Sequence, residues 1–169
     1  MRNRLLVLIL FVSITGCSHR YYVVRHAEKA IAPPGNEDLA KDPNLSAAGA
    51  ERTRDLQERL QDAKISRVYS TATVRTEATA APIATYFNLP IRKYSSVDTG
   101  FINELRSLKE NVLIVGHSNT VDDIVNALVP SAKMTDLPET DYDNLYIIKK
   151  KGRRFLLQKT KYGAPSAVK

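Results

Sequence analysis

Two of the three histidines directly follow apolar segments of the chain. His26 comes after residues 22–25, and His117 comes after residues 113–116. Such short β-branched and aromatic segments are typical of strands, and ligands bind at the carboxyl ends of strands in open α/β sheets. We therefore expect the two imidazoles to converge on one crevice. A single histidine at a strand end is more often structural, so this prediction depends on the pair and on Arg25 beside the first.

The sequence around these histidines resembles the signatures of the histidine phosphatase (phosphoglycerate mutase-like) superfamily. Residues 25–29, Arg-His-Ala-Glu-Lys, look like its Arg-His-Gly or Arg-His-Ala element. Residues 69–80, with Arg75 near the start of a predicted helix after a strand, are similar to its second element. Residues 115–119, Val-Gly-His-Ser-Asn, match its third. The three elements occur in the family's order and with family-like separations.

The resemblance implies that His26 is a nucleophile that forms a phosphohistidine, while Arg25, Arg75 and His117 hold the phosphate. These side chains suit the chemistry, because phosphoryl transfer depends on positioning and on neutralising charge spread over the phosphoryl oxygens. A neutral imidazole attacks phosphorus only through a free ring nitrogen, so we expect a backbone carbonyl to hold the other N–H of His26. The implied mechanism needs no metal or organic cofactor, and three His with one Cys are too few for a zinc cluster.

The proton donor to the leaving group is the least defined part of the predicted site. Many family members supply an Asp or Glu after the second helix, where this chain offers Asp98 and Glu104, with Asp98 nearer the expected place. Asp98 could instead cap a helix, and Glu104 could be an exposed helix carboxylate. Asn119 stands where some phytase-like relatives carry a carboxylate, and it cannot act as an acid. Small members without a strong acid favour leaving groups that depart easily, such as those of phosphoramidates or phosphoanhydrides.

Residues 1–16 have the pattern of a secretory signal, because two arginines precede the apolar run 5–12. That run is too short for a transmembrane helix. It ends in small residues before Cys17, which resembles the lipobox of bacterial lipoproteins and implies cleavage before Cys17 and lipidation of its thiol. Ser18 then implies a lipid anchor in the outer membrane of a bacterial cell envelope, facing the periplasm. A simple signal peptide with an incidental cysteine, or a buried N-terminal strand, is the alternative.

The rest of the chain alternates between strand and helix patterns. Strands are expected at 21–25, 67–70, 91–94 and 111–115, and a terminal hairpin at 144–148 and 155–159. Residues 32–44, rich in Pro and Gly, read as a long loop. This alternation predicts an α/β fold of three layers, α/β/α, with a largely parallel central sheet, which is phosphoglycerate mutase-like by resemblance.

Four helices are expected between these strands, and three of them carry detailed predictions. Ser46 should cap the first helix, with Gly49, Thr53, Leu56 and Leu60 on one face. The second, at 74–87, should present the stripe Val74, Ala78, Ala81, Ala84 and Phe87. A third helix is expected at 99–108. The helix after His117 should be capped by Asn119 or Thr120.

Composition is that of a globular protein with one core, so we expect residues 18–169 to form a single domain. Loss of residues 1–16 removes two arginines and no acid, which takes the formal charge from +7 to +5. Basic residues gather near the C-terminus, where they could face anionic lipid or simply be the solvated edge of the hairpin. Nothing beyond charge suggests nucleic-acid binding. The basic residues are Lys149, Lys150, Lys151, Arg153, Arg154, Lys159 and Lys161.

Three functions fit this sequence. The first is a phosphohydrolase acting on a phosphorylated small molecule or phosphoprotein. The second is a phosphoglycerate mutase-type phosphotransferase, which export argues against because a glycolytic isomerase has no obvious substrate outside the cytoplasm. The third is a non-catalytic lipoprotein that binds a phosphorylated ligand, which the full set of His26, His117 and two arginines argues against.

Overall fold

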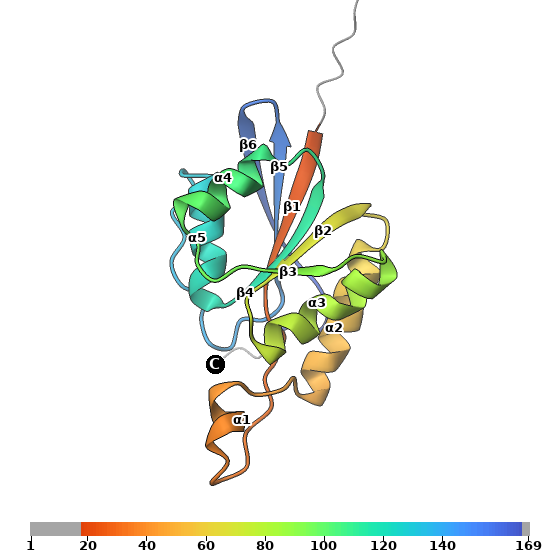
Figure 1. The fold of residues 1–169 in the computed structure, drawn as a ribbon, viewed down its shortest axis with the longest axis vertical. Coiled ribbons are helices and arrows are strands. Elements are labelled where there is room, and N and C mark those ends of the chain that lie inside the picture. The colour runs from red at the N-terminus through yellow and green to blue at the C-terminus, as the bar shows by residue number, and fades with distance from the viewer. Residues whose placement is uncertain (1–17, 167–169) are drawn as a thin grey trace, which may run out of the picture.

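A six-stranded sheet forms the centre of the fold in the computed structural model, which describes residues 18–166 (Figure 1). Its strands are β1 (Ser18–Arg25), β2 (Ile65–Ser70), β3 (Ile91–Lys93), β4 (Asn111–Gly116), β5 (Asn144–Lys151) and β6 (Arg154–Lys161). Their order is β3-β2-β4-β1-β5-β6. The first four strands in this order are parallel, whereas β5 and β6 pair in antiparallel fashion. The predicted, largely parallel sheet and the terminal hairpin are confirmed.

Helices cover both faces of the sheet. α2 (Ala47–Leu60) and α3 (Val74–Tyr86) pack on one face, and α4 (Thr99–Ser107) and α5 (Ser118–Leu128) pack on the other (Figure 1). The three-layer α/β/α prediction is therefore confirmed. Among the described residues, no helix is long and apolar enough to cross a membrane.

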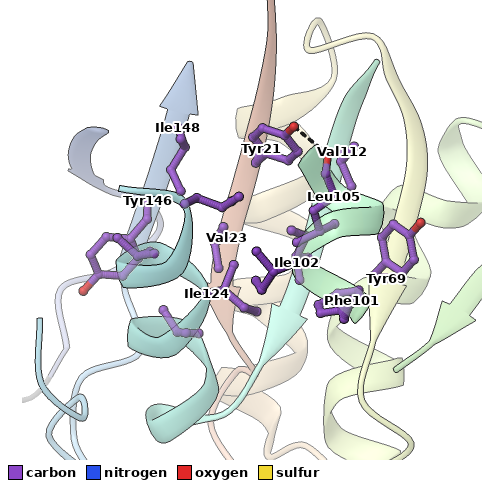
Figure 2. Close-up of a cluster of buried hydrophobic side chains, with 14 of the residues drawn as sticks. Tyr21, Val23, Tyr69, Phe101, Ile102, Leu105, Val112, Ile124, Tyr146 and Ile148 are labelled. Atoms are coloured by element: carbon purple, nitrogen blue, oxygen red, sulfur yellow. Dashed lines mark hydrogen bonds between the residues drawn. The ribbon is translucent and has the colours of Figure 1, made fainter. Parts of the chain in front are cut away.

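Alternate residues of β1 enter the two cores on either side of the sheet. Tyr21 and Val23 pack with α4 and α5, and Figure 2 shows this core. Tyr22 and Val24 pack with α2 and α3 instead. Since successive strand residues point to opposite faces, a strand that is covered on both sides must be apolar throughout.

Helix α2 has the predicted cap and face. The Ser46 hydroxyl accepts a hydrogen bond from the Gly49 amide at 3.1 Å, and the four residues of the predicted face are buried. The stripe predicted for α3 is wrong, because Val74 is exposed and the buried face contains Thr76 and Thr79. Both hydroxyls make hydrogen bonds inside the protein, so these polar residues can be buried where an apolar pattern does not reveal them.

Two boundaries differ from the sequence-based expectation. Helix α5 begins at Ser118 with His117 as its N-cap, so capping by Asn119 or Thr120 is wrong. Thr120 instead accepts a hydrogen bond from the His117 amide at 2.7 Å, since it is the third residue of the helix. The expected loop at 32–44 contains a short helix, α1 (Glu37–Lys41), which Asn36 caps.

The two ends of the sheet carry different parts of the sequence. Ser18 pairs with Lys151, so the start of β1 lies beside the turn between β5 and β6. Arg25 pairs with Gly116 at the opposite end, the end from which α1 projects (Figure 1). The signal segment 1–16 and the lipidation site predicted at Cys17 lie outside the described residues.

Candidate active site

The ends of β1 and β4 bring the two strand-end histidines together. The His26 amide donates a hydrogen bond to the Gly116 carbonyl at 2.9 Å, which ties the residue after β1 to the last residue of β4. The rings of His26 and His117 lie edge to face with their centroids 5.4 Å apart. The convergence predicted from the strand ends is thus present, and it places both imidazoles at the ligand-binding edge of the sheet.

His26 is held as a neutral imidazole with one nitrogen free. Its side chain is 3% exposed, and Nδ1 lies 2.8 Å from the Ala27 carbonyl oxygen. Because a carbonyl oxygen only accepts, Nδ1 must carry the hydrogen. Burial lowers the pKa of His26 to about 3, helped by the positive charges of Arg25 and Arg75 and opposed by the Ala27 carbonyl. At neutral pH the Nε2 lone pair is therefore available to attack an electrophile.

Arg25 lies beside His26, and it is a buried charge that is only 2% exposed. Its Nη1 donates to the Pro138 carbonyl at 2.7 Å, and its Nη2 donates to the Glu139 carboxylate at 3.3 Å. The guanidinium also lies 4.5 Å from the centre of the Tyr142 ring. The segment before β5 therefore orients a charge that the sequence pattern places at the end of β1.

Arg75 lies in the first turn of α3, and two partners define its position. Its Nη1 donates to the Asp42 carboxylate at 2.9 Å, and its Nη2 lies 3.4 Å from Nδ1 of His117. The other oxygen of Asp42 accepts from the Val74 amide at 2.9 Å. Asp42 follows α1 directly, so the segment predicted as a loop supplies a carboxylate that orients Arg75.

A chain of threonines fixes which ring nitrogen of His117 carries a hydrogen. The Thr76 hydroxyl donates to the carbonyl oxygens of Thr71 and Thr73, at 2.9 and 3.0 Å. Its oxygen accepts from the Thr71 hydroxyl at 3.0 Å, so the Thr71 oxygen must in turn accept from Nε2 of His117 at 2.9 Å. Neutral His117 therefore carries its hydrogen on Nε2 and presents the Nδ1 lone pair toward Arg75.

Burial, with the help of two arginines, keeps His117 neutral at neutral pH in the free protein. Burial lowers its pKa to about 4, assisted by Arg75 and Arg25 and opposed by Asp42. Nδ1 becomes a hydrogen-bond donor only when the ring gains a proton. A bound phosphate dianion would favour protonation of the ring, because its negative charge would offset the positive charges of the two arginines.

Neither candidate acid joins the cluster formed by Arg25, His26, Arg75 and His117. Asp98 caps α4, where its carboxylate accepts from the Phe101 amide at 2.9 Å and from the Ser96 hydroxyl at 2.6 Å, and these hydrogen bonds lower its pKa. Glu104 accepts a hydrogen bond from the Tyr69 hydroxyl. Both line a cavity of about 230 Å³ to which none of the four cluster residues contributes. The structure therefore supports the capping alternative for Asp98, and a catalytic role for it stays a prediction.

Several residues of the site were not identified from sequence. Asp42, Glu139 and Tyr142 lie in irregular segments without a motif, and Thr71 and Thr76 fall inside a quoted motif without an assigned role. Within residues 18–166 no group of three His, Cys, Asp or Glu side chains could hold a metal ion. A cavity of about 250 Å³ adjoins Arg75, and its other lining residues are Lys29, Ala30, Ala32, Leu39, Ala40, Lys41 and Pro43.

Solved structures with this fold include several phosphatases. The chain is similar to a protein from Agrobacterium tumefaciens provisionally assigned as the phosphohistidine phosphatase SixA (20% identity, covering 87% of this chain and 98% of that one, TM-score 0.60). It is also similar to the protein histidine phosphatase SixA in complex with tungstate (18% identity, 84% and 96% covered, TM-score 0.64). A third is mycobacterial glucosyl-3-phosphoglycerate phosphatase with VO3 (12% identity, 86% and 99% covered, TM-score 0.61). At these identities the likeness shows the fold.

The sequence itself also matches a family profile over part of its length. No curated protein has a matching sequence. The profile of the histidine phosphatase superfamily (branch 1) matches residues 21–97, which include Arg25, His26 and Arg75. This match supports the resemblance found in the sequence: over residues 21–97 the chain is similar to the histidine phosphatase superfamily (branch 1).

Proposed function

We propose that this protein is a phosphohydrolase that works through a phosphohistidine on His26. The observation that carries the proposal is the neutral His26 ring, whose Nδ1–H is held by the Ala27 carbonyl and whose Nε2 is free beside two guanidinium groups. In the first step Nε2 forms a bond to phosphorus while the bond to the leaving group breaks. In the second step water attacks phosphorus, the N–P bond breaks, and inorganic phosphate leaves.

Three charged or chargeable groups support both steps. Arg25 and Arg75 can each make paired, charge-assisted bonds to the phosphoryl oxygens as negative charge spreads over them. His117, once protonated, adds a third donor through Nδ1. These groups supply the positive charge that a metal ion provides in other phosphatases, so we propose that the reaction is independent of metal.

The placement of the carboxylates limits the substrate class. With Asp98 capping α4 and Glu104 bonded to Tyr69, neither candidate acid contacts the cluster. We propose substrates whose leaving group departs without a strong acid, such as a phosphoramidate on a protein histidine or a phosphoanhydride. The names of two similar structures agree with the first choice, since both are described as histidine phosphatases. The oxyanions bound to two of them agree with a phosphate site.

The proposed location follows from the sequence alone. We propose that residues 1–16 are removed and that lipid on Cys17 anchors residues 18–169 in the outer membrane, facing the periplasm. The first described residue, Ser18, already belongs to β1, so an anchor on Cys17 would hold the domain close to the bilayer. The substrate would then be a phosphorylated compound or protein of the cell envelope.

Replacing His26 by Ala should abolish turnover and phosphoenzyme formation together, because the lone pair of the other neutral imidazole, on Nδ1 of His117, faces the Arg75 guanidinium. The protein is mixed with an aryl phosphate, quenched, and mapped by mass spectrometry for acid-labile phosphate. The matched control is His19→Gln, which alters a histidine outside the cluster and should keep both signals. Phosphate on another residue, or wild-type turnover by His26→Ala, would show that the nucleophile is wrong. Folded wild-type protein that binds vanadate without any turnover would instead support the non-catalytic alternative.

Replacing Asp98 by Asn should change the hydrolysis of alkyl and nitrophenyl phosphates little, because Asn also caps helices well. If Asp98 were the general acid, the alkyl phosphate would slow by ~10²- to 10⁴-fold and the nitrophenyl phosphate far less. The ratio of the two kcat/KM values separates these cases. Glu104→Gln, measured in the same way, is the matched comparison.

Intact-mass analysis of membrane fractions should find a chain that begins at a lipidated Cys17. Three acyl chains hold a protein firmly in a bilayer, whereas one chain alone binds marginally. The Cys17→Ala variant should leave the membrane fraction or keep residues 1–16. An unmodified Cys17 in the native protein would contradict the anchor and leave the proposed chemistry untouched.

A further inference from the structure

The third histidine lies in a cationic cavity at the end of the sheet opposite the catalytic cluster. This cavity has a volume of about 190 Å³ and is lined by His19, Lys109, Lys150 and Gly152. The catalytic cluster contains none of these residues, and no carboxylate lines the cavity. Its position is set by the pairing of His19 with Lys150 between β1 and β5.

His19 has an unusual hydrogen-bonding state for a buried side chain. It is 5% exposed, and its Nε2 lies 3.0 Å from the Tyr21 hydroxyl oxygen. Figure 2 shows that hydroxyl bonded to the Leu105 carbonyl, so Tyr21 donates there and accepts from Nε2 of His19. Nδ1 is buried and has no partner among residues 18–166. His19 lines the cavity, and its buried ring nitrogen without a partner is a candidate ligand contact.

Lys150 is held in place at this cavity, and Lys109 is exposed beside it. The Lys150 ammonium donates to the Arg106 carbonyl and lies 5.7 Å from the centre of the Phe155 ring. The nearby carboxylate of Glu110 forms an ion pair with Arg67. The cavity therefore keeps a net positive charge, which suits an anion.

We propose that this cavity binds the phosphate of an anionic lipid headgroup, held by Lys109 and Lys150 and by His19 through Nδ1. The surface around it favours a lipid over a free phosphate. The turn after β5 places exposed Lys151, Arg153 and Arg154 beside the cavity, and such basic clusters are attracted to anionic bilayers.

This placement orients the whole molecule at the membrane. Ser18, which follows the proposed anchor at Cys17, pairs with Lys151 at the same end of the sheet. The ends of β1 and β4 that carry His26 and His117 lie at the other end (Figure 1). A domain bound through its basic end therefore presents the catalytic cluster away from the bilayer. The binding site does not depend on the proposed phosphatase activity.

Binding should strengthen as the pH falls from 7.5 to 5.5. Nδ1 of His19 can donate to a phosphate only after the ring gains a proton. Burial and the charge of Lys150 lower the pKa of His19, and Glu110 opposes them. Tyr21 also contacts the ring, and burial raises its pKa to about 12, so its hydroxyl stays neutral over this pH range. The charge of a bound headgroup favours the protonated ring, so lower pH favours the complex.

The test uses residues 18–169, which contain the complete sheet and both cores. A domain of this extent suffices for the fold, since two similar solved chains are covered over 96% and 98% of their length. Sedimentation with phosphatidylglycerol vesicles, compared with phosphatidylcholine vesicles, should show binding to the anionic lipid alone. The pair Lys109→Gln with Lys150→Gln should weaken it at least ~10-fold, since each lysine near an anionic surface contributes about a kcal/mol before its direct contacts are counted. The pair Lys93→Gln with Lys159→Gln has the same net charge and should bind almost as wild type.

Several outcomes would overturn the proposal. Equal loss in the two lysine pairs would mean that overall charge, and not the cavity, governs binding. Equal affinity for free glycerophosphate and for vesicles would mean a soluble anion site instead of a membrane contact. His19→Gln should remove the pH dependence. If that variant unfolds, the ¹⁵N shift of His19 Nδ1 in the wild type should still move when vesicles are added, and an unmoved signal would exclude His19. Aryl phosphate turnover is measured in parallel, so that a failure of the proposed phosphatase activity is distinguished from a failure of the proposed lipid binding.

Discussion

The hydrogen bond from Nδ1–H of His26 to the Ala27 carbonyl is the interaction on which the proposed chemistry depends. A buried imidazole beside two arginines loses its proton readily, but it becomes a nucleophile only if the remaining hydrogen lies on the nitrogen that faces away from phosphorus. The Ala27 carbonyl enforces that choice because it can only accept. Burial keeps His26 neutral, and the charges of Arg25 and Arg75, which would attract a phosphate, add to that effect.

The loop after His26 is fixed by contacts with α2, and these contacts hold the Ala27 carbonyl in place. The backbone carbonyl of Glu28 accepts from the Ser46 amide at 2.9 Å, and the Glu28 carboxylate accepts from both Nε and Nη2 of Arg52. Gly49 lies so close that a Cβ there would come within 2.2 Å of the Glu28 carbonyl oxygen. The glycine and the salt bridge therefore support the loop after His26 although neither belongs to the cluster itself.

Sequence alone predicts the strands, the four longer helices and the four residues of the cluster, because strand ends and short motifs are local features. The remaining parts of the site depend on contacts between distant segments. Asp42 meets Arg75 only when the segment containing α1 folds over α3, and Glu139 reaches Arg25 from the opposite half of the chain. The buried face of α3 differs from the predicted stripe for a related reason. Thr79 is buried and its hydroxyl oxygen accepts from the Ala27 amide, a contact that a pattern of apolar residues cannot indicate. Asp98 shows a different limit of sequence reasoning: a carboxylate at the expected place in sequence caps its own helix, and its catalytic role stays a prediction.

The most direct test of this account is the protonation state of His26 in the free enzyme, followed by ¹⁵N NMR of the imidazole nitrogens across a pH titration. We predict a neutral ring with its hydrogen on Nδ1 from pH 8 to about pH 4, since its pKa is lowered to about 3. At pH values above its own pKa of about 4, His117 should also be neutral, with its hydrogen on Nε2. A His26 signal that titrates near pH 6.5, or one that carries its hydrogen on Nε2, would contradict the account.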